Sequence, residues 1–197
     1  MKNLAQIILA IGVISMVGSF GCSKAVKYER YSSKDIEINM AMDYISGWLF
    51  SESRGAENSY AQVIFYEPQR KDKNIKAGIV VTVRDSSKLN LDPLSVDSFV
   101  DDLLSRRGKL KDMKLLSRSK STVLGSEAVS VLLSYKTIDM LNNINAKLVP
   151  VKEKVVVFKN NNKFYTIRYQ NMEKEFNVFN KAFSHILKTA ELRTVNK

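Results

Sequence analysis

Apolar side chains recur at every second position over several stretches of the chain. Between residues 77 and 84, Ile79, Val81 and Val83 form a wholly apolar face, and the residues between them form a second, partly apolar face. A period of two predicts a β-strand, and two apolar faces indicate a sheet covered on both sides. Comparable runs predict further strands at 28–32, 36–40, 61–67, 113–119, 127–136, 152–159 and 163–170.

Turn-forming residues separate these runs. Residues 32–35 favour a turn, which predicts an N-terminal β-hairpin. Pro68 ends the strand before it, because proline cannot donate a hydrogen bond to a ladder. The asparagines at 160–162 tolerate left-handed backbone and predict a hairpin between the last two strands. Residues 41–48 are expected to be less regular, and residues 137–150 to form a loop or an irregular insertion.

Two segments have the spacing of helices instead. The first is predicted at 95–107, with Ser95 as its N-cap and Asp97 in the first turn, where the helix dipole favours an anion. Gly108 is the expected stop. The second is predicted at 172–192. Because its apolar residues form one stripe, it is expected to pack on the sheet, against strands such as 129–135 and 165–169. That stripe consists of Phe176, Phe179, Phe183, Ile186, Leu187 and Ala190.

The first residues of the chain have the pattern of a secretory signal. Lys2 is followed by an apolar run and then by small residues, which predicts a signal peptide at 1–21. The position of Cys22 directly after this run resembles the signal of a bacterial lipoprotein, in which the cysteine carries the lipid. Ser19 departs from that pattern, so ordinary signal cleavage and an uncleaved anchor remain alternatives. Residues 22–27 are then a short tether.

Composition and charge narrow the remaining possibilities. Residues 28–197 have the length of a single domain, and 45% of the chain is apolar, which suffices for one core. The single cysteine excludes an internal disulfide and a cysteine-based zinc site. A net charge of +11 is consistent with binding to an anionic membrane surface or to an acidic protein partner. The alternative is that the charge only keeps the protein soluble. Nucleic acid is not expected as a partner, because a signal peptide takes the protein out of the cytoplasm and because the sequence contains no nucleic-acid-binding motif.

Candidate catalytic chemistry is sparse. His185 is the only histidine, and the helical spacing places it away from the apolar stripe, as a solvated surface residue. Cys/His catalysis and a multi-histidine metal site are therefore excluded. The chain has no G-x-S-x-G elbow, phosphate loop or dinucleotide fingerprint, so no cofactor is expected.

Two charged clusters are candidate sites. Asp97, Asp101 and Asp102 lie on the first predicted helix, where Asp97 and Asp101 share a face and could help to bind calcium or act in an enzyme. The preference of helix starts for anions explains the same residues more simply. A second cluster, predicted either to dock an acidic partner or to be a solvated turn, consists of Arg70, Lys71, Lys73 and Lys76.

Several short segments resemble the PsbP-like family. They are 31–38 with Trp48 shortly after, 124–128, 164–169 and the final aromatic helix. The resemblance implies an α/β/α sandwich. Photosynthetic members are extrinsic subunits of photosystem II associated with its calcium and chloride requirement, and many bacterial members are lipoproteins carrying a lipid such as palmitate. The proline that usually precedes the tryptophan is absent, because Ser46 and Gly47 stand there.

These observations predict an α+β fold: an α/β/α sandwich with a central antiparallel sheet, an N-terminal β-hairpin and a C-terminal helix packed on the sheet. The expected function is that of a non-enzymatic accessory or binding protein. It would be a monomer, anchored by lipid at the periplasmic or extracytoplasmic face, and it would dock to a membrane complex or acidic partner through a basic surface. The alternative is an envelope enzyme or calcium-binding protein that uses Asp97 and Asp101, which a deep cleft converging on these acids would favour.

Overall fold

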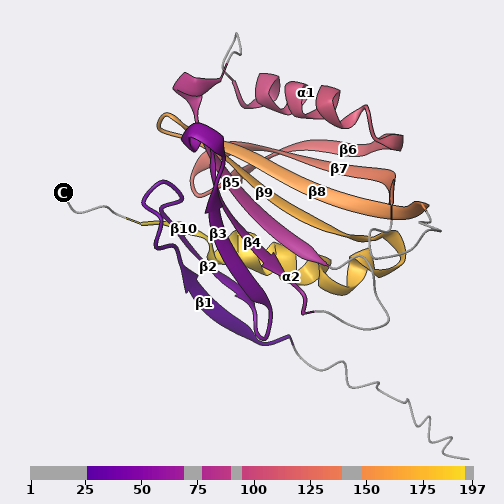
Figure 1. Cartoon of the computed structure of the whole chain (residues 1–197), viewed down its shortest axis with the longest axis horizontal. Coiled ribbons are helices and arrows are strands. Elements are labelled where there is room, and N and C mark those ends of the chain that lie inside the picture. Colours follow the sequence, from indigo (N-terminus) through magenta and orange to yellow (C-terminus); the bar gives the residue numbers. More distant parts are fainter. Residues whose placement is uncertain (1–25, 69–76, 90–94, 139–147, 194–197) are drawn as a thin grey trace, which may run out of the picture.

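A central seven-stranded antiparallel sheet separates two helices in the computed structural model, which describes residues 26–68, 77–89, 95–138 and 148–193. The strand order is β3-β4-β5-β9-β8-β7-β6. Helix α1 covers one face of this sheet, and α2 covers the other together with a small sheet of order β1-β2-β10 (Figure 1). The predicted α+β sandwich is therefore confirmed.

Most strands lie beside the strand that precedes or follows them in the sequence. Both sheets are antiparallel throughout, and most neighbouring strands are joined directly. Short 3₁₀ turns occur at Ala56–Asn58, Ser86–Lys88 and Glu173–Glu175. The strands are β1 Tyr28–Ser32, β2 Met40–Ile45, β3 Leu49–Arg54, β4 Ala61–Tyr66, β5 Gly78–Asp85, β6 Lys111–Val123, β7 Ser126–Ile138, β8 Leu148–Asn160, β9 Lys163–Met172 and β10 Glu191–Leu192, and the helices are α1 Val96–Arg107 and α2 Phe176–Thr189.

The N-terminal hairpin exists, but its second strand lies further along the chain than predicted. Strand β1 pairs with β2 at Met40–Ile45, not with residues 36–40. Strand β3 was not predicted at all. Alanine and methionine have little preference for strands, which concealed β2. Strand β3 is an edge strand whose side chains are largely exposed, so no apolar alternation marks it.

The loop or irregular insertion predicted at 137–150 overlaps two strands at its ends. Strand β7 continues to Ile138, and β8 begins at Leu148. Pro150 therefore lies inside β8, where it pairs with Lys136 of β7. Strand β9 joins β8 only from Val151 onward, so Pro150 has a neighbouring strand on one side, a position that tolerates proline. Residues 139–147 lie outside the described residues.

Helix α1 begins as predicted. The Ser95 hydroxyl accepts a hydrogen bond from the backbone N–H of Ser98, and the Ser98 hydroxyl accepts one from the backbone N–H of Ser95, forming a capping box. The helix ends at Gly108, which keeps right-handed helical backbone with φ −56°. Phe99 anchors α1 to the sheet by stacking on Phe164 of β9, with ring centroids 4.7 Å apart.

Helix α2 packs on the opposite face with its aromatic stripe inward. Phe183 is fully buried, and its ring centroid lies 5.6 Å from that of Tyr169 in β9. The predicted contact with residues 165–169 is therefore confirmed. The predicted contact with residues 129–135 is largely wrong, because the large apolar side chains Val129, Val131, Leu133 and Tyr135 belong to the core under α1, whereas Leu132 packs against the core that contains the α2 stripe. Apolar residues on both faces of β7 made the two faces indistinguishable in the sequence.

Candidate functional site

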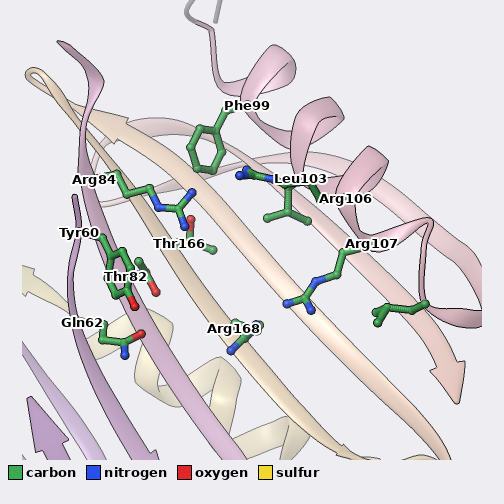
Figure 2. A pocket seen from close by; sticks show the side chains of 11 residues that line it. Tyr60, Gln62, Thr82, Arg84, Phe99, Leu103, Arg106, Arg107, Thr166 and Arg168 are labelled. Atoms are coloured by element: carbon green, nitrogen blue, oxygen red, sulfur yellow. The ribbon is translucent and has the colours of Figure 1, made fainter. Parts of the chain in front are cut away.

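A cleft of about 370 Å³ opens between α1 and the uncovered part of the sheet (Figure 2). Its floor is a cross-strand row: Gln62 of β4 pairs with Thr82 of β5, which pairs with Thr166 of β9. Helix α1 packs over β7 and β8, where the buried side chains beneath it are valines together with Leu133 and Tyr135. The polar row lies beyond this contact, so it stays open.

Four arginines surround this cleft. Arg84 comes from β5 and Arg168 from β9, whereas Arg106 and Arg107 form the last turn of α1. The side chains from the helix and from the sheet reach into the same space (Figure 2). Guanidinium groups keep their charge at physiological pH and offer forked donors that match carboxylate and phosphate oxygens. The arrangement can therefore bind an anion.

A buried carboxylate fixes two of these arginines. Glu153 of β8 is fully buried, and its Oε1 accepts a 3.0 Å hydrogen bond from Arg107 Nη2. The same oxygen lies 3.4 Å from Nε of Arg168. A buried carboxylate is tolerated only when such partners compensate its lost hydration. Glu153 consequently orients Arg107 and Arg168 and neutralises one of their two charges.

Of the other two arginines, Arg84 and Arg106, only Arg106 is paired with a carboxylate in the described part of the chain. Arg106 contacts the carboxylate of Asp102 one helical turn earlier. Arg84 has no ion pair within the described residues and lies 5.7 Å from the ring centroid of Tyr60. Burial lowers the pKa of Arg84, and the positive charge of Arg106 lowers it further. Both causes reflect a guanidinium held in an electropositive, partly dehydrated place, which an anion would stabilise.

One wall of the cleft is apolar. Phe99 and Leu103 of α1 contribute to it, together with Leu110 beyond the helix. Volumes of roughly 300–1,000 Å³ that combine apolar walls with a few convergent polar groups are typical of small-molecule sites. The cleft therefore suits a group that carries both negative charge and apolar surface.

The helix carboxylates singled out in the sequence lie elsewhere. Asp97 and Asp101 both bind Arg118 of β6, at 2.6 and 2.5 Å. Lys120 adds a contact of 3.1 Å to Asp97, and the hydrogen bond from Arg118 is the main cause that lowers the pKa of Asp97. Neither carboxylate lines the cleft. Among the described residues, no group of three or more acidic, histidine or cysteine side chains is placed to hold a metal ion.

His185 has partners that the sequence did not indicate. Its Nε2 lies 3.0 Å from Oδ2 of Asp43 in β2, and its ring stacks on Tyr28 of β1 with centroids 3.9 Å apart. The side chain is 39% exposed, so the expectation of a freely solvated histidine is corrected. The second face of α2 meets the small sheet, a contact that helical spacing alone cannot reveal.

Other predicted site residues lie outside the described residues. These are the lipidation site Cys22 and the four docking candidates Arg70, Lys71, Lys73 and Lys76. Arg84 and Arg168 were not predicted as site residues, although each follows a threonine by two positions on a strand. That spacing marks a polar face, but the pairing of β5 with β9 that joins the two faces is not readable from the sequence.

Comparison with known proteins finds similarity in structure alone. No family model matches the chain, and no curated protein matches its sequence. The cyanobacterial PsbP protein CyanoP from Synechocystis sp. PCC 6803 matches with a TM-score of 0.54 and 16% identity, over 89% of this chain and 98% of that one. The Ran-binding protein Mog1p from Saccharomyces cerevisiae matches with a TM-score of 0.52 and 9% identity, over 85% and 96%.

Protein PA94 from Pseudomonas aeruginosa, described as of unknown function, matches with a TM-score of 0.52 and 14% identity, over 86% of this chain and 97% of that one. Likeness at these identities establishes a shared fold, which is the Mog1p/PsbP-like fold. The resemblance to PsbP-like proteins is thus confirmed for the fold. Fold does not carry function, which must be argued from the site. Within the described ranges, no helix has the length and apolar character that crossing a bilayer requires.

Proposed function

We propose that this chain is a non-enzymatic binding protein, held at the extracytoplasmic face of a membrane by a lipid on Cys22, that docks to an acidic partner. The observation that carries this proposal is the gathering of Arg84, Arg106, Arg107 and Arg168 around one cleft. Only two carboxylates, Glu153 and Asp102, pair with these four arginines in the described part of the chain. The cleft thus keeps a positive charge that an acidic group of the partner would neutralise.

The charged groups of the cleft are suited to binding rather than to proton transfer. Arginine stays protonated across the physiological range, so it can hold an anion but cannot act as a general base. The alternative, an enzyme or calcium site at Asp97 and Asp101, has less support because Arg118 already occupies both carboxylates. Their separation from the cleft also removes the converging geometry that catalysis would need.

The proposed anchor restricts where the partner is found. Strand β1 begins at Tyr28, directly after the tether of residues 22–27. At up to about 3.6 Å per residue, these six residues span at most about 22 Å when extended. A domain held by lipid on Cys22 therefore stays near the membrane surface, and its acidic partner belongs to the same membrane or lies against it.

Site-specific cross-linking in cells tests the proposal. A photoreactive amino acid at Gln62, on the cleft floor, should cross-link one partner in the membrane fraction. The band should disappear with Arg84→Glu, because reversing this charge repels an acidic group. It should persist with Lys181→Glu, a matched reversal on the exposed side of α2. Cys22→Ser should release the protein from the membrane or leave its precursor unprocessed.

Two outcomes would contradict the proposal. Cross-linking that does not respond to Arg84→Glu would show that the cleft does not dock the partner. A mature protein that stays in the membrane pellet with an unmodified Cys22 would show that a lipid on this cysteine is not the anchor.

A further inference from the structure

The charges around the cleft do not cancel. Each of the four arginines contributes one positive charge, while Glu153 and Asp102 contribute one negative charge each. Glu153 is shared between Arg107 and Arg168, and Asp102 contacts Arg106, so about two positive charges remain. One of them is Arg84, which is half-buried and has no ion pair within the described residues. A single carboxylate would neutralise only half of this excess.

From this excess charge and the apolar wall beside it, we infer that the cleft binds a phosphate monoester carried on an aromatic or other apolar body. The inference rests on the proposed function and names the acidic group that the cleft receives. A phosphate monoester carries about −1.5 to −2 charges at neutral pH, with three strong acceptor oxygens. That charge matches the remaining two positive charges.

The neutral donors on the floor also fit a phosphate. Thr82 and Thr166 face each other across β5 and β9 in the same row as Gln62, and all three line the cleft beside Arg84. Arginine forks bind phosphate through two parallel hydrogen bonds, and hydroxyl groups can supply the remaining donors. A carboxylate, with two oxygens, would leave more of these convergent donors unused.

The size of the cleft requires more than an inorganic ion. Its 370 Å³ lies within the roughly 300–1,000 Å³ of small-molecule sites, and a bare phosphate would fill a small part of it. Phe99, Leu103 and Leu110 offer an apolar wall next to the arginines. An apolar body attached to the phosphate would lie against this wall and add hydrophobic burial to the ionic contacts.

Calorimetric titration of the purified full-length chain in detergent tests the inference. Phenyl phosphate is the probe, with inorganic phosphate, benzoate and the dianion phthalate as comparisons at one ionic strength. Phenyl phosphate should bind more tightly than the other three. Its affinity should rise by up to about tenfold from pH 5.0 to pH 7.5, because the second phosphate ionisation lies near pH 6. Benzoate is ionised at both pH values, so its binding should not change.

Variants locate the binding. Arg84→Gln should weaken phenyl phosphate by at least about tenfold, the loss expected for a charge-assisted hydrogen bond. Lys181→Gln removes the same charge from the exposed face of α2 and should stay within about twofold. Arg106 lines the cleft from the exposed end of α1. Arg106→Gln should therefore weaken binding of phenyl phosphate, and it should leave the fold unchanged because the side chain is largely exposed.

A blocked phosphotyrosine peptide in the same titration identifies the source of the phosphate. Equal binding of peptide and phenyl phosphate assigns the site to a phosphorylated side chain, and binding of phenyl phosphate alone assigns it to a small molecule. The inference is overturned if phenyl phosphate does not saturate the protein, if phthalate binds as well, or if Arg84→Gln binds normally. In those cases an Arg84-dependent cross-link from Gln62 would still support docking of a carboxylate-bearing partner.

Discussion

At the scale of single residues, Glu153 explains why the arginines are ordered. A fully buried carboxylate is costly unless charged donors reach it, and both Arg107 and Arg168 do so. The same carboxylate raises the pKa of Tyr135, after burial as the main cause. Glu153 therefore belongs to the supporting structure of the cleft, where it holds two guanidinium groups in place.

A second carboxylate gives a test of stability against pH. Asp35 accepts two hydrogen bonds from Arg54, both of 2.7 Å, and a third from the backbone N–H of Glu37. The bonds from Arg54 are the main cause that lowers the pKa of Asp35 below its ordinary value of 3.8. The ionised form is therefore stabilised in the folded state. This contribution is complete above the ordinary pKa and is lost as the pH falls through the folded pKa.

Asp35→Asn should accordingly lower the free energy of unfolding by about 1–3 kcal/mol at pH 7. Lowering the pH from 7 to 2.5 moves the parent protein toward the folded pKa of Asp35, so the difference between the two proteins should shrink as the parent begins to lose the same charge. Urea denaturation at the two pH values measures both quantities. Glu57→Gln, at an exposed position, serves as the control and should have little effect. An equal cost of Asp35→Asn at both pH values would show that the carboxylate charge is not the stabilising feature.

At the scale of elements, the inner face of α2 determines much of the stability. Phe183 is fully buried among the aromatic side chains of α2 and β9. Phe183→Ala should leave a cavity and lower the free energy of unfolding by about 3–5 kcal/mol in denaturant melts. His185→Ala should cost less, about 1 kcal/mol, because it removes a partly exposed hydrogen-bonding contact with Asp43 and a stack on Tyr28. Equal costs would contradict this assignment of the two faces of α2.

The elements also show what could be predicted from the sequence. Both helices, and strands with clear alternation such as β5 and β9, were predicted within a few residues because burial of one face imposes the period. Strand β3 was missed because it is exposed at an edge, as Phe50 at 48% exposure illustrates. Alternation of apolar and polar residues shows that the two faces of a strand differ, but it does not show which helix covers each face.

The candidate site was less predictable than the fold for the same reason. Arg106 and Arg107 lie in the last turn of α1, where the helix dipole favours basic residues whether or not they belong to a site. Their role beside Arg84 and Arg168 depends on how α1 lies over the sheet and on the pairing of β5 with β9. Both are tertiary features that join distant parts of the chain, so local sequence patterns do not contain them.

At the scale of the whole molecule, the two faces of the sheet differ in kind. The face under α2 is closed by aromatic packing and by the small sheet formed by β1, β2 and β10 (Figure 1). The face under α1 is covered over β7, β8 and Phe164 of β9, and it is open over β4, β5 and the part of β9 that carries Thr166 and Arg168. The fold therefore closes one side of the sheet with packed aromatic side chains and leaves a charged cleft beside the apolar core on the other side.

The most direct test of this assignment is a crystal structure grown with phenyl phosphate near neutral pH. We expect the phosphate between α1 and the sheet, within hydrogen-bonding distance of Arg84 and the threonines of the floor, and the phenyl ring against Phe99 and Leu103. Phenyl phosphate bound at another surface, with the cleft empty at saturating concentration, would contradict the assignment of the cleft as the binding site.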